Sequence, residues 1–180
     1  MTARTGIYEI MLGASFADLP PVLQRVHRAQ GIQLTGTLRV RWSQRRWLRV
    51  LLHLSALPRP AQAAPTRVAI TPLAAGEQWH RQIGGTLVAS RMEGARAGQV
   101  TERMGSLALA LDTRVDGAGR LRQASRRVSL FGMPLPWLRV LANERALDGH
   151  RYCCDVRIWM PRLGYLLRYD GVLAICEPDL

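Results

Sequence analysis

Lysine is absent from this chain of 180 residues, so all 25 of its basic residues are arginines, and they outnumber 13 acidic residues to give a formal charge of +12. A complete absence of lysine indicates GC-rich coding rather than selection for one site. A basic surface attracts anions, nucleic acid and anionic membranes. The chain nevertheless carries no zinc-finger, basic-zipper or single-strand-binding signature, so we expect no specific nucleic-acid partner. The arginines cluster at two places, Arg45, Arg46 and Arg49, and Arg120, Arg122, Arg126 and Arg127, which we interpret as solvated faces.

Long apolar runs are also absent. No uncharged stretch approaches the roughly 18 residues that a membrane-spanning helix needs. Glu9 interrupts the apolar N-terminal stretch, so we expect no secretory signal there. These absences favour a cytoplasmic location.

Residues and motifs that carry chemistry are scarce. The three cysteines Cys153, Cys154 and Cys176 are an odd number and make a poor disulfide framework, so we expect buried thiols. The four histidines show no metal-binding spacing. No GxSxG, P-loop or GxGxxG motif occurs, and no pair of carboxylates suggests acid–base work. We therefore expect no metal and no cofactor. An enzyme is the less favoured interpretation, in which Glu102, His80 and Arg81 would be the first residues to test.

What the sequence does contain is a succession of short strands. Alternating runs separated by glycine-containing turns follow one another from residue 66 to residue 175, and residues 32–42 form an earlier run of the same kind. Short connections join antiparallel neighbours, and so many sequential strands tend to curl until few free edges remain. We expect a single domain over residues 1–180, α+β but mainly β. Its core would be a strongly curved antiparallel sheet or barrel of about eight to nine strands with two helices in the N-terminal half, at residues 17–31 and 43–60.

The second of these helices is amphipathic. Trp47 and its apolar neighbours form a broad face, which Arg45, Arg46 and Arg49 partly oppose. Three interpretations stay open: the helix packs on the sheet, it is a movable lid, or residues 43–57 contact a membrane surface.

The strand alternation also predicts which residues line the interior. The run 77–85 places Trp79, Arg81 and Ile83 on one face, where Arg81 would receive a carboxylate or phosphate group. Glu102 is interpreted as a solvent-facing strand residue opposite an arginine. The full set of predicted lining residues is Trp42, Trp79, Arg81, Leu107, Leu109, Leu111, Trp137 and Tyr165.

The uncharged stretch SLFGMPLPWL, residues 129–138, does not fit a regular strand, because Pro134 and Pro136 each lack an N–H group. We interpret it as an apolar crossover that caps one end of the sheet, with Trp137 pointing inward. As alternatives, Phe131, Met133 and Leu135 would form, together with Trp47, a lid over a pocket or a surface for a partner.

Four segments in order resemble a bacterial family. They are IYEIMLGASFADLPPVLQRVH, EQWHRQIGG followed by ASR and VTERMGSLALAL, SLFGMPLPWL, and MPRLGYLLRYDGVL. Together they resemble, over about residues 7–175, the bacterial domain-of-unknown-function family that is often fused behind saccharopine-dehydrogenase-like NAD(P)-binding domains. The resemblance implies an association with redox enzymes but no mechanism, and this chain lacks the Rossmann domain.

Three functions follow as hypotheses. The first is a non-enzymatic binding module that holds a hydrophobic or lipid-like small molecule in a β-rich cavity. The second is an accessory domain that acts with a separate saccharopine-dehydrogenase-like NAD(P)-dependent reductase. The third is peripheral attachment to a membrane.

Overall fold

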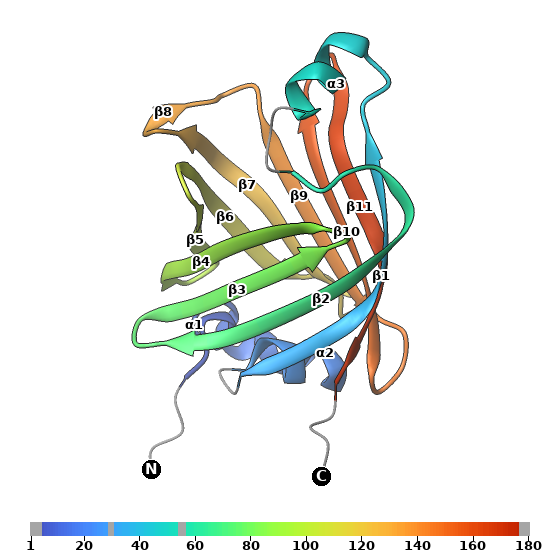
Figure 1. Ribbon diagram of the computed structural model, residues 1–180. Coiled ribbons are helices and arrows are strands. Elements are labelled where there is room, and N and C mark those ends of the chain that lie inside the picture. Colours follow the sequence, from blue (N-terminus) through green and yellow to red (C-terminus); the bar gives the residue numbers. More distant parts are fainter. Residues whose placement is uncertain (1–4, 29–30, 54–56, 177–180) are drawn as a thin grey trace.

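The computed structural model describes residues 5–28, 31–53 and 57–176, and in it the chain forms a closed antiparallel β-barrel with few helices (Figure 1). Ten strands build the barrel and a short eleventh, β8, lies outside it. The strands are β1 Ile32–Trp42, β2 Ala61–Leu73, β3 Gly76–Ile83, β4 Thr86–Arg96, β5 Gln99–Met104, β6 Leu107–Val115, β7 Leu121–Leu130, β8 Met133–Pro134, β9 Arg139–Ala146, β10 Arg151–Met160 and β11 Gly164–Ile175.

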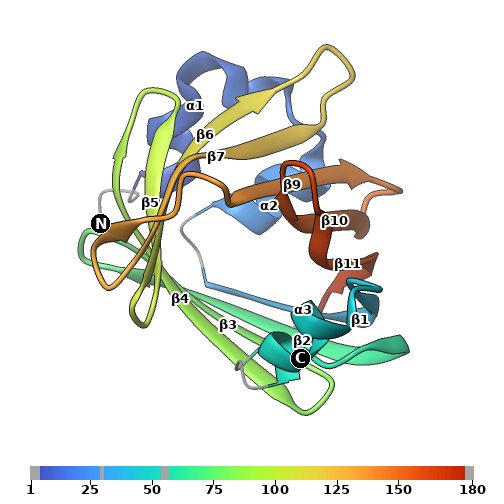
Figure 2. The same ribbon diagram turned by 90° about the horizontal axis from the view of Figure 1, so that it is seen from above.

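Each barrel strand pairs with antiparallel neighbours, in the order β6-β5-β4-β3-β2-β1-β11-β10-β9-β7. A further pairing of β6 with β7 closes the circle, in a register that runs from Leu107 opposite Leu130 to Val115 opposite Leu121. Seen along the barrel axis in Figure 2, the strands surround a central space. The prediction of a curved antiparallel barrel is confirmed, because the short connections do join neighbours.

The predicted number of strands, eight to nine, is too low. The barrel has ten strands, and the short β8 lies outside it. The strand that the alternation did not reveal is β9, which pairs with both β7 and β10. Its cavity-lining positions hold Val140, Ala142 and Glu144, and none of its residues is fully buried. A strand with two small or charged inward residues lacks the apolar alternation on which the prediction rests.

Three helices and a 3-10 turn accompany the barrel, where two helices were expected. The helix α2 Pro21–His27 lies within the predicted range 17–31 and α3 Arg46–His53 lies within 43–60. The helix α1 Ile7–Leu12 was not predicted, and η1 Gly13–Asp18 joins it to α2. Glu9 caps α1 by accepting the backbone N–H of Gly6 at 2.6 Å.

The two N-terminal helices close one end of the barrel, while α3 stands at the opposite end (Figure 1). The side chains of Tyr8, Leu23 and Val26 are buried against the strands. The backbone N–H of Gly98 donates to the Met11 carbonyl at 2.7 Å and so ties α1 to the connection between β4 and β5. We call the helix-covered end the base and the end that carries α3 the mouth.

The helix α3 packs on the barrel with part of its apolar face. Leu48 and Leu52 are buried, whereas Trp47 and Val50 are exposed. Packing on the barrel therefore accounts for Leu48 and Leu52 and leaves Trp47 and Val50 exposed to solvent. Residues 54–56 of the predicted membrane-contact segment lie outside the described residues. No helix among the described residues has the length and hydropathy that crossing a membrane requires.

Two glycines allow β1 and β11 to approach closely. A Cβ atom at Gly171 would lie 2.2 Å from the carbonyl oxygen of Thr37, and one at Gly36 would lie 2.1 Å from that of Val172. Glycine inside a strand commonly marks such a close backbone approach or a tight bend at a barrel corner. The pairing of the first barrel strand with the last thus depends on these two positions.

The variant Gly171→Ala should lower the free energy of unfolding by about 1–3 kcal/mol, because the added methyl group must displace neighbouring backbone. Denaturant unfolding measures the effect. Gly85→Ala is the matched control, since its methyl group would meet nothing within 4 Å, and it should change stability by less than about 0.5 kcal/mol. Equal stability of Gly171→Ala and Gly85→Ala would contradict this role.

Candidate functional site

A cavity of about 430 Å³ lies inside the barrel. Its lining is mainly aliphatic and aromatic and comes from β1 to β7 and β9 to β11 together with Tyr8 of α1. It extends from Tyr8 and Tyr152 near the base to Leu57, Leu87 and Leu138 at the mouth. Leu87 both lines the cavity and is exposed to solvent, so the cavity opens at the mouth.

Five of the predicted lining residues do line this cavity, namely Trp79, Arg81, Leu107, Leu109 and Leu111. The alternation in β3 and β6 identified them because both strands are regular there. Trp42, Trp137 and Tyr165 are not among the lining residues. Trp42 is buried elsewhere: its Nε1 donates to the Pro58 carbonyl at 2.8 Å and its ring meets the edge of His53, so it holds the segment around α3 on the barrel.

A β-bulge explains the place of Tyr165. The pairing of β10 with β11 shifts between Ile158 and Trp159, so that Ile158 lies opposite Leu167 while Trp159 lies opposite Tyr165. One extra residue in a strand reverses the faces beyond it. Tyr165 therefore does not line the cavity, although the alternation predicted that it would. Leu167 and Tyr169, farther along β11, do line it.

The stretch 129–138 forms a hairpin rather than a plug. Leu130 pairs with Met133, so Phe131 and Gly132 make a two-residue turn at the mouth. The prediction that Trp137 points inward is wrong, because its side chain is 52% exposed and the neighbouring Leu138 lines the cavity. Of the predicted lid residues, Phe131, Met133 and Trp47 are exposed, whereas Leu135 packs partly against the core.

Arg81 is the centre of a polar cluster in the cavity wall. Its guanidinium donates to Glu102 at 3.1 Å and to the Ser90 hydroxyl at 2.7 Å, and Ser90 itself donates to Glu102 at 2.6 Å. The guanidinium also lies over the Trp79 ring, 4.6 Å from its centroid. Burial alone would lower the pKa of Arg81, but the Glu102 carboxylate together with Tyr169 and Tyr8 raises it above its ordinary value. Glu102, expected to face solvent, is instead buried as the partner of Arg81.

A second buried cluster lies at the base. His27 Nε2 lies 2.8 Å from a carboxylate oxygen of Glu144, and its ring stacks against Tyr8 at 4.0 Å. Glu77, also buried, accepts the Trp79 Nε1–H at 3.1 Å. Burial raises the pKa of the Glu77 carboxyl above its ordinary value, although the nearby His27 and the hydrogen bond from Trp79 lower it in part. Sequence reasoning missed this cluster because its members come from α2, β3, β9 and α1.

Two tyrosines of the lining offer free hydroxyl groups. Tyr152 and Tyr169 line the cavity, and no hydrogen-bond partner for either hydroxyl is present in the described part of the chain. Burial is the main cause that raises the pKa of both hydroxyls above the ordinary value, so they keep their protons at neutral pH. Burial likewise raises the pKa of the Cys154 thiol in the same wall. Neutral donors thus face the cavity beside charged groups that are already paired.

The residues first considered for catalysis do not come together. Arg81 and Glu102 meet in the cavity wall, but His80, the neighbour of Arg81 in β3, is exposed. Within residues 5–28, 31–53 and 57–176, no group of three or more His, Cys, Asp or Glu side chains is arranged to hold a metal ion.

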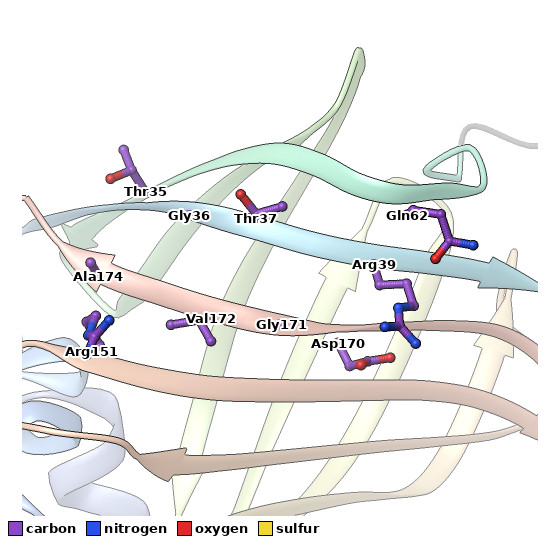
Figure 3. A pocket seen from close by; sticks show the side chains of 10 residues that line it. All are labelled: Thr35, Gly36, Thr37, Arg39, Gln62, Arg151, Asp170, Gly171, Val172 and Ala174. Carbon is purple, nitrogen blue, oxygen red and sulfur yellow. The ribbon is translucent and has the colours of Figure 1, made fainter.

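A second hollow, of about 480 Å³, lies along β1 and β11, where Gly36 and Gly171 leave the wall without side chains (Figure 3). Arg39 and Arg151 lie toward its two ends, with Asp170 beside Arg39. Its members do not line the barrel cavity, so the two spaces are distinct.

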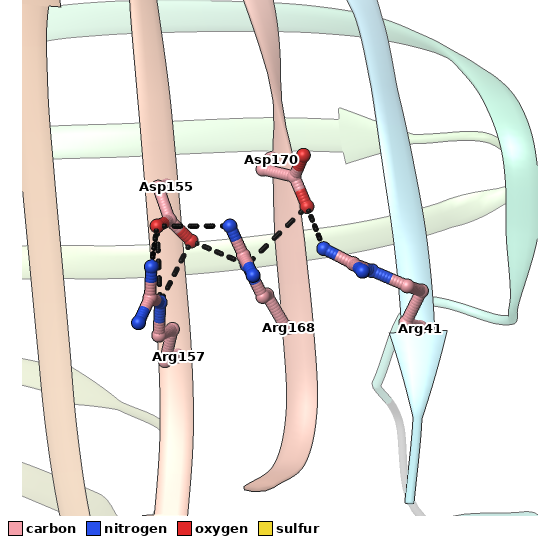
Figure 4. A network of polar contacts seen from close by, with 5 residues as sticks. All are labelled: Arg41, Asp155, Arg157, Arg168 and Asp170. Atoms are coloured by element: carbon pink, nitrogen blue, oxygen red, sulfur yellow. Dashed lines mark hydrogen bonds and ion pairs between the residues drawn. The ribbon is translucent and has the colours of Figure 1, made fainter.

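Charged residues of β1, β10 and β11 form a chain of ion pairs (Figure 4). Asp155 binds Arg157 and Arg168, and Asp170 links Arg168 to Arg41, with Arg41 and Asp170 at 2.7 Å. Burial would raise the pKa of Asp155, but the hydrogen bonds from Arg157 and Arg168 outweigh it and lower the pKa. This network ties three strands together next to the glycine contacts of β1 and β11.

The buried pair predicts strong coupling. Arg81→Met should cost about 3–5 kcal/mol of unfolding free energy because it leaves the Glu102 charge unpaired, and the double variant Arg81→Met/Glu102→Leu should recover most of this. Arg103→Met is the control. It breaks the ion pair of Arg103 with Glu93, in which the Arg103 side chain is 58% exposed, and it should cost at most about 1 kcal/mol of unfolding free energy. Denaturant unfolding measures all three variants, and additive losses at Arg81 and Glu102 would contradict the pairing.

Comparisons with known proteins identify a family for this chain. A search of curated proteins and a search of solved structures found no match. One family model, the domain of unknown function DUF4166, matches residues 19–173. The match begins after α1 and includes the helices α2 and α3 and all of the barrel except the last two residues of β11. The chain therefore belongs to the DUF4166 family.

Proposed function

We propose that the chain is a binding module that holds a hydrophobic small molecule with a neutral polar group inside its barrel. The observation that carries the proposal is the cavity of about 430 Å³, mainly apolar, whose wall includes two tyrosines with no hydroxyl partner among the described residues. Small-molecule sites typically measure about 300–1,000 Å³ and combine an apolar lining with a few placed polar groups. Barrels of this kind often hold one small ligand.

The charges of the wall favour a neutral ligand over an acid. The lining contains one cation, Arg81, and two carboxylates, Glu102 and Glu144. Arg81 already binds Glu102 and Ser90 through Nη1, so the carboxylate of Glu102 balances its charge before a ligand binds. An anionic ligand would thus meet a neutralised cation and, in addition, the Glu144 carboxylate at low dielectric, which is unfavourable. A hydroxyl or carbonyl oxygen of a ligand would instead accept hydrogen bonds from Tyr152 and Tyr169.

The same pairing favours binding over catalysis. Arg81 and Glu102 neutralise each other, and Glu144 is held by His27. A general acid or base must reach its substrate with a proton to give or take. Groups that are engaged with each other serve better as a fixed wall of the cavity.

A second candidate function uses the outside of the mouth. Phe131, Met133 and Trp137 are exposed together on the hairpin and the loop that follows it. An accessory domain for a saccharopine-dehydrogenase-like reductase acting in trans would dock through such apolar side chains. Recovery of a dehydrogenase-like protein by the wild-type chain but not by Phe131→Ser would favour this candidate, whereas recovery of none would oppose it.

Filling the cavity should abolish binding of apolar molecules. Ala142 lines the cavity, whereas Ala124, on the neighbouring strand β7, is exposed and does not. Ala142→Phe should weaken binding of the neutral fluorescent probe N-phenylnaphthylamine at least about tenfold, equivalent to about 1.4 kcal/mol. Ala124→Phe should bind the probe like the wild type. Fluorescence titration measures both, and equal binding by the two variants would place the probe outside the barrel.

If the neutral hydroxyls of Tyr152 and Tyr169 anchor the ligand, the barrel should prefer an alcohol to a carboxylic acid of the same chain length. Tetradecanol should displace the probe at lower concentration than tetradecanoate at neutral pH, because the charge of Arg81 is already balanced by Glu102 and the acid would also lie near Glu144. Tyr169→Phe should weaken tetradecanol about two- to tenfold, the usual worth of one hydrogen bond. Tyr165→Phe, outside the cavity, is the control and should change nothing. Tighter binding of tetradecanoate would contradict the neutral anchor while leaving the cavity proposal intact.

A further inference from the structure

The exposed apolar side chains are unevenly distributed over the barrel. Nine large apolar residues of the described chain are exposed, and two of them, Ile10 and Leu147, belong to the base. The other seven belong to α3, to the start of β4, to the β7–β9 connection and to the end of β10. They are Trp47, Val50, Leu87, Phe131, Met133, Trp137 and Trp159.

These elements share one end because the strands alternate in direction. In an antiparallel barrel whose strands follow one another, every second connection lies at the same end. The β1–β2, β3–β4, β5–β6, β7–β9 and β10–β11 connections therefore surround the mouth. Figures 1 and 2 show α3 and the hairpin of β7 and β8 on different sides of it. The apolar residues thus form a rim around the opening of the cavity rather than one flat patch.

The rim is also basic. The described residues of the five connections at the mouth contain no Asp or Glu, whereas Arg45, Arg46 and Arg49 of the α3 segment and Arg162 of the β10–β11 turn are exposed there. No carboxylate partner for these four arginines is found in the part of the chain that the structure describes. The acidic residues of the chain lie along the barrel wall or at the base, as Glu9, Asp116 and Asp148 do.

The tip of the β7–β8 hairpin is held in an uncommon conformation. Phe131 has a φ of +51° and the following Gly132 one of +79°. Two-residue hairpin turns with both φ values positive strongly favour Asn, Asp or Gly, and a bulky residue in this region is an outlier. The Phe131 side chain at this tip is 77% exposed. The backbone N–H of Phe131 donates to the Ser106 carbonyl at 2.9 Å, which fixes the tip against the β5–β6 turn.

We infer that the mouth of the barrel docks on an anionic lipid membrane. Aromatic and aliphatic side chains would enter the interface between headgroups and acyl chains, while the unpaired arginines contact anionic headgroups. A protein partner would have to match both an apolar ring and an excess of positive charge, whereas an anionic membrane supplies both at once. Where the proposed function also holds, the docked barrel opens its cavity toward the lipid, so that an apolar ligand passes between membrane and protein without crossing water.

Flotation of the full chain with lipid vesicles tests the docking. The wild type should bind vesicles of phosphatidylcholine mixed with phosphatidylglycerol, bind phosphatidylcholine alone far less, and dissociate as salt is added. Each arginine near an anionic surface strengthens binding roughly fivefold, so the triple variant Arg45→Gln/Arg46→Gln/Arg49→Gln should weaken it about a hundredfold. Phe131→Ser/Trp137→Ser should also release the protein from the mixed vesicles.

The matched control is Ile10→Ser/Leu147→Ser, which removes exposed apolar residues at the base and should bind like the wild type. Phe131 and Trp137 do not line the cavity, so their variant should keep probe binding, which shows that it is folded. Absence of vesicle binding by the wild type, or equal losses in the rim and base variants, would overturn the docking. Protection of Phe131 and Trp137 by a protein partner without vesicle binding would assign the rim to that partner. None of these outcomes alters the probe titration, so the cavity proposal is judged separately.

Discussion

The pairing of β6 with β7 is the constraint on which the rest of the molecule depends. It joins the two ends of a ten-strand sheet, so neither β6 nor β7 presents a free edge in the barrel. A barrel of about eight strands is just filled by its own side chains, and its diameter grows with the number of strands. Closing ten strands therefore leaves interior space, and α1 and α2 fill that space only at the base. The cavity thus results from the number of strands and from helices that fill only one end of the barrel.

Polar groups follow the same division between wall, base and mouth. Inside, Arg81 pairs with Glu102, and His27 Nε2 lies 2.8 Å from a carboxylate oxygen of Glu144. On β1, β10 and β11, arginines alternate with Asp155 and Asp170 in one connected network. At the mouth, no described residue offers a carboxylate to Arg45, Arg46, Arg49 or Arg162. The mouth thus combines exposed apolar side chains with exposed arginines and carries no Asp or Glu among its described residues.

Regular alternation allowed much of this to be predicted. The antiparallel barrel, the helices α2 and α3, and the inward positions Trp79, Arg81 and Leu109 all follow from patterns within single elements. Features that depend on one inserted residue, or on partners that are distant in the sequence, could not be predicted from such patterns. A bulge changed the pairing of Tyr165, and β9 carries too few large apolar residues to be recognised. The pairing of Glu102 with Arg81 joins strands β5 and β3, which no local pattern records.

The central claim is that the barrel carries an apolar, uncharged molecule. The most direct measurement is mass spectrometry of an organic extract of the protein purified from its native host, with Ala142→Phe purified in parallel. The account predicts one uncharged apolar compound, bearing a hydroxyl or carbonyl group, that is present in the wild-type extract and depleted from the variant. An extract that contains no bound compound, or the same compounds in both proteins, would contradict it.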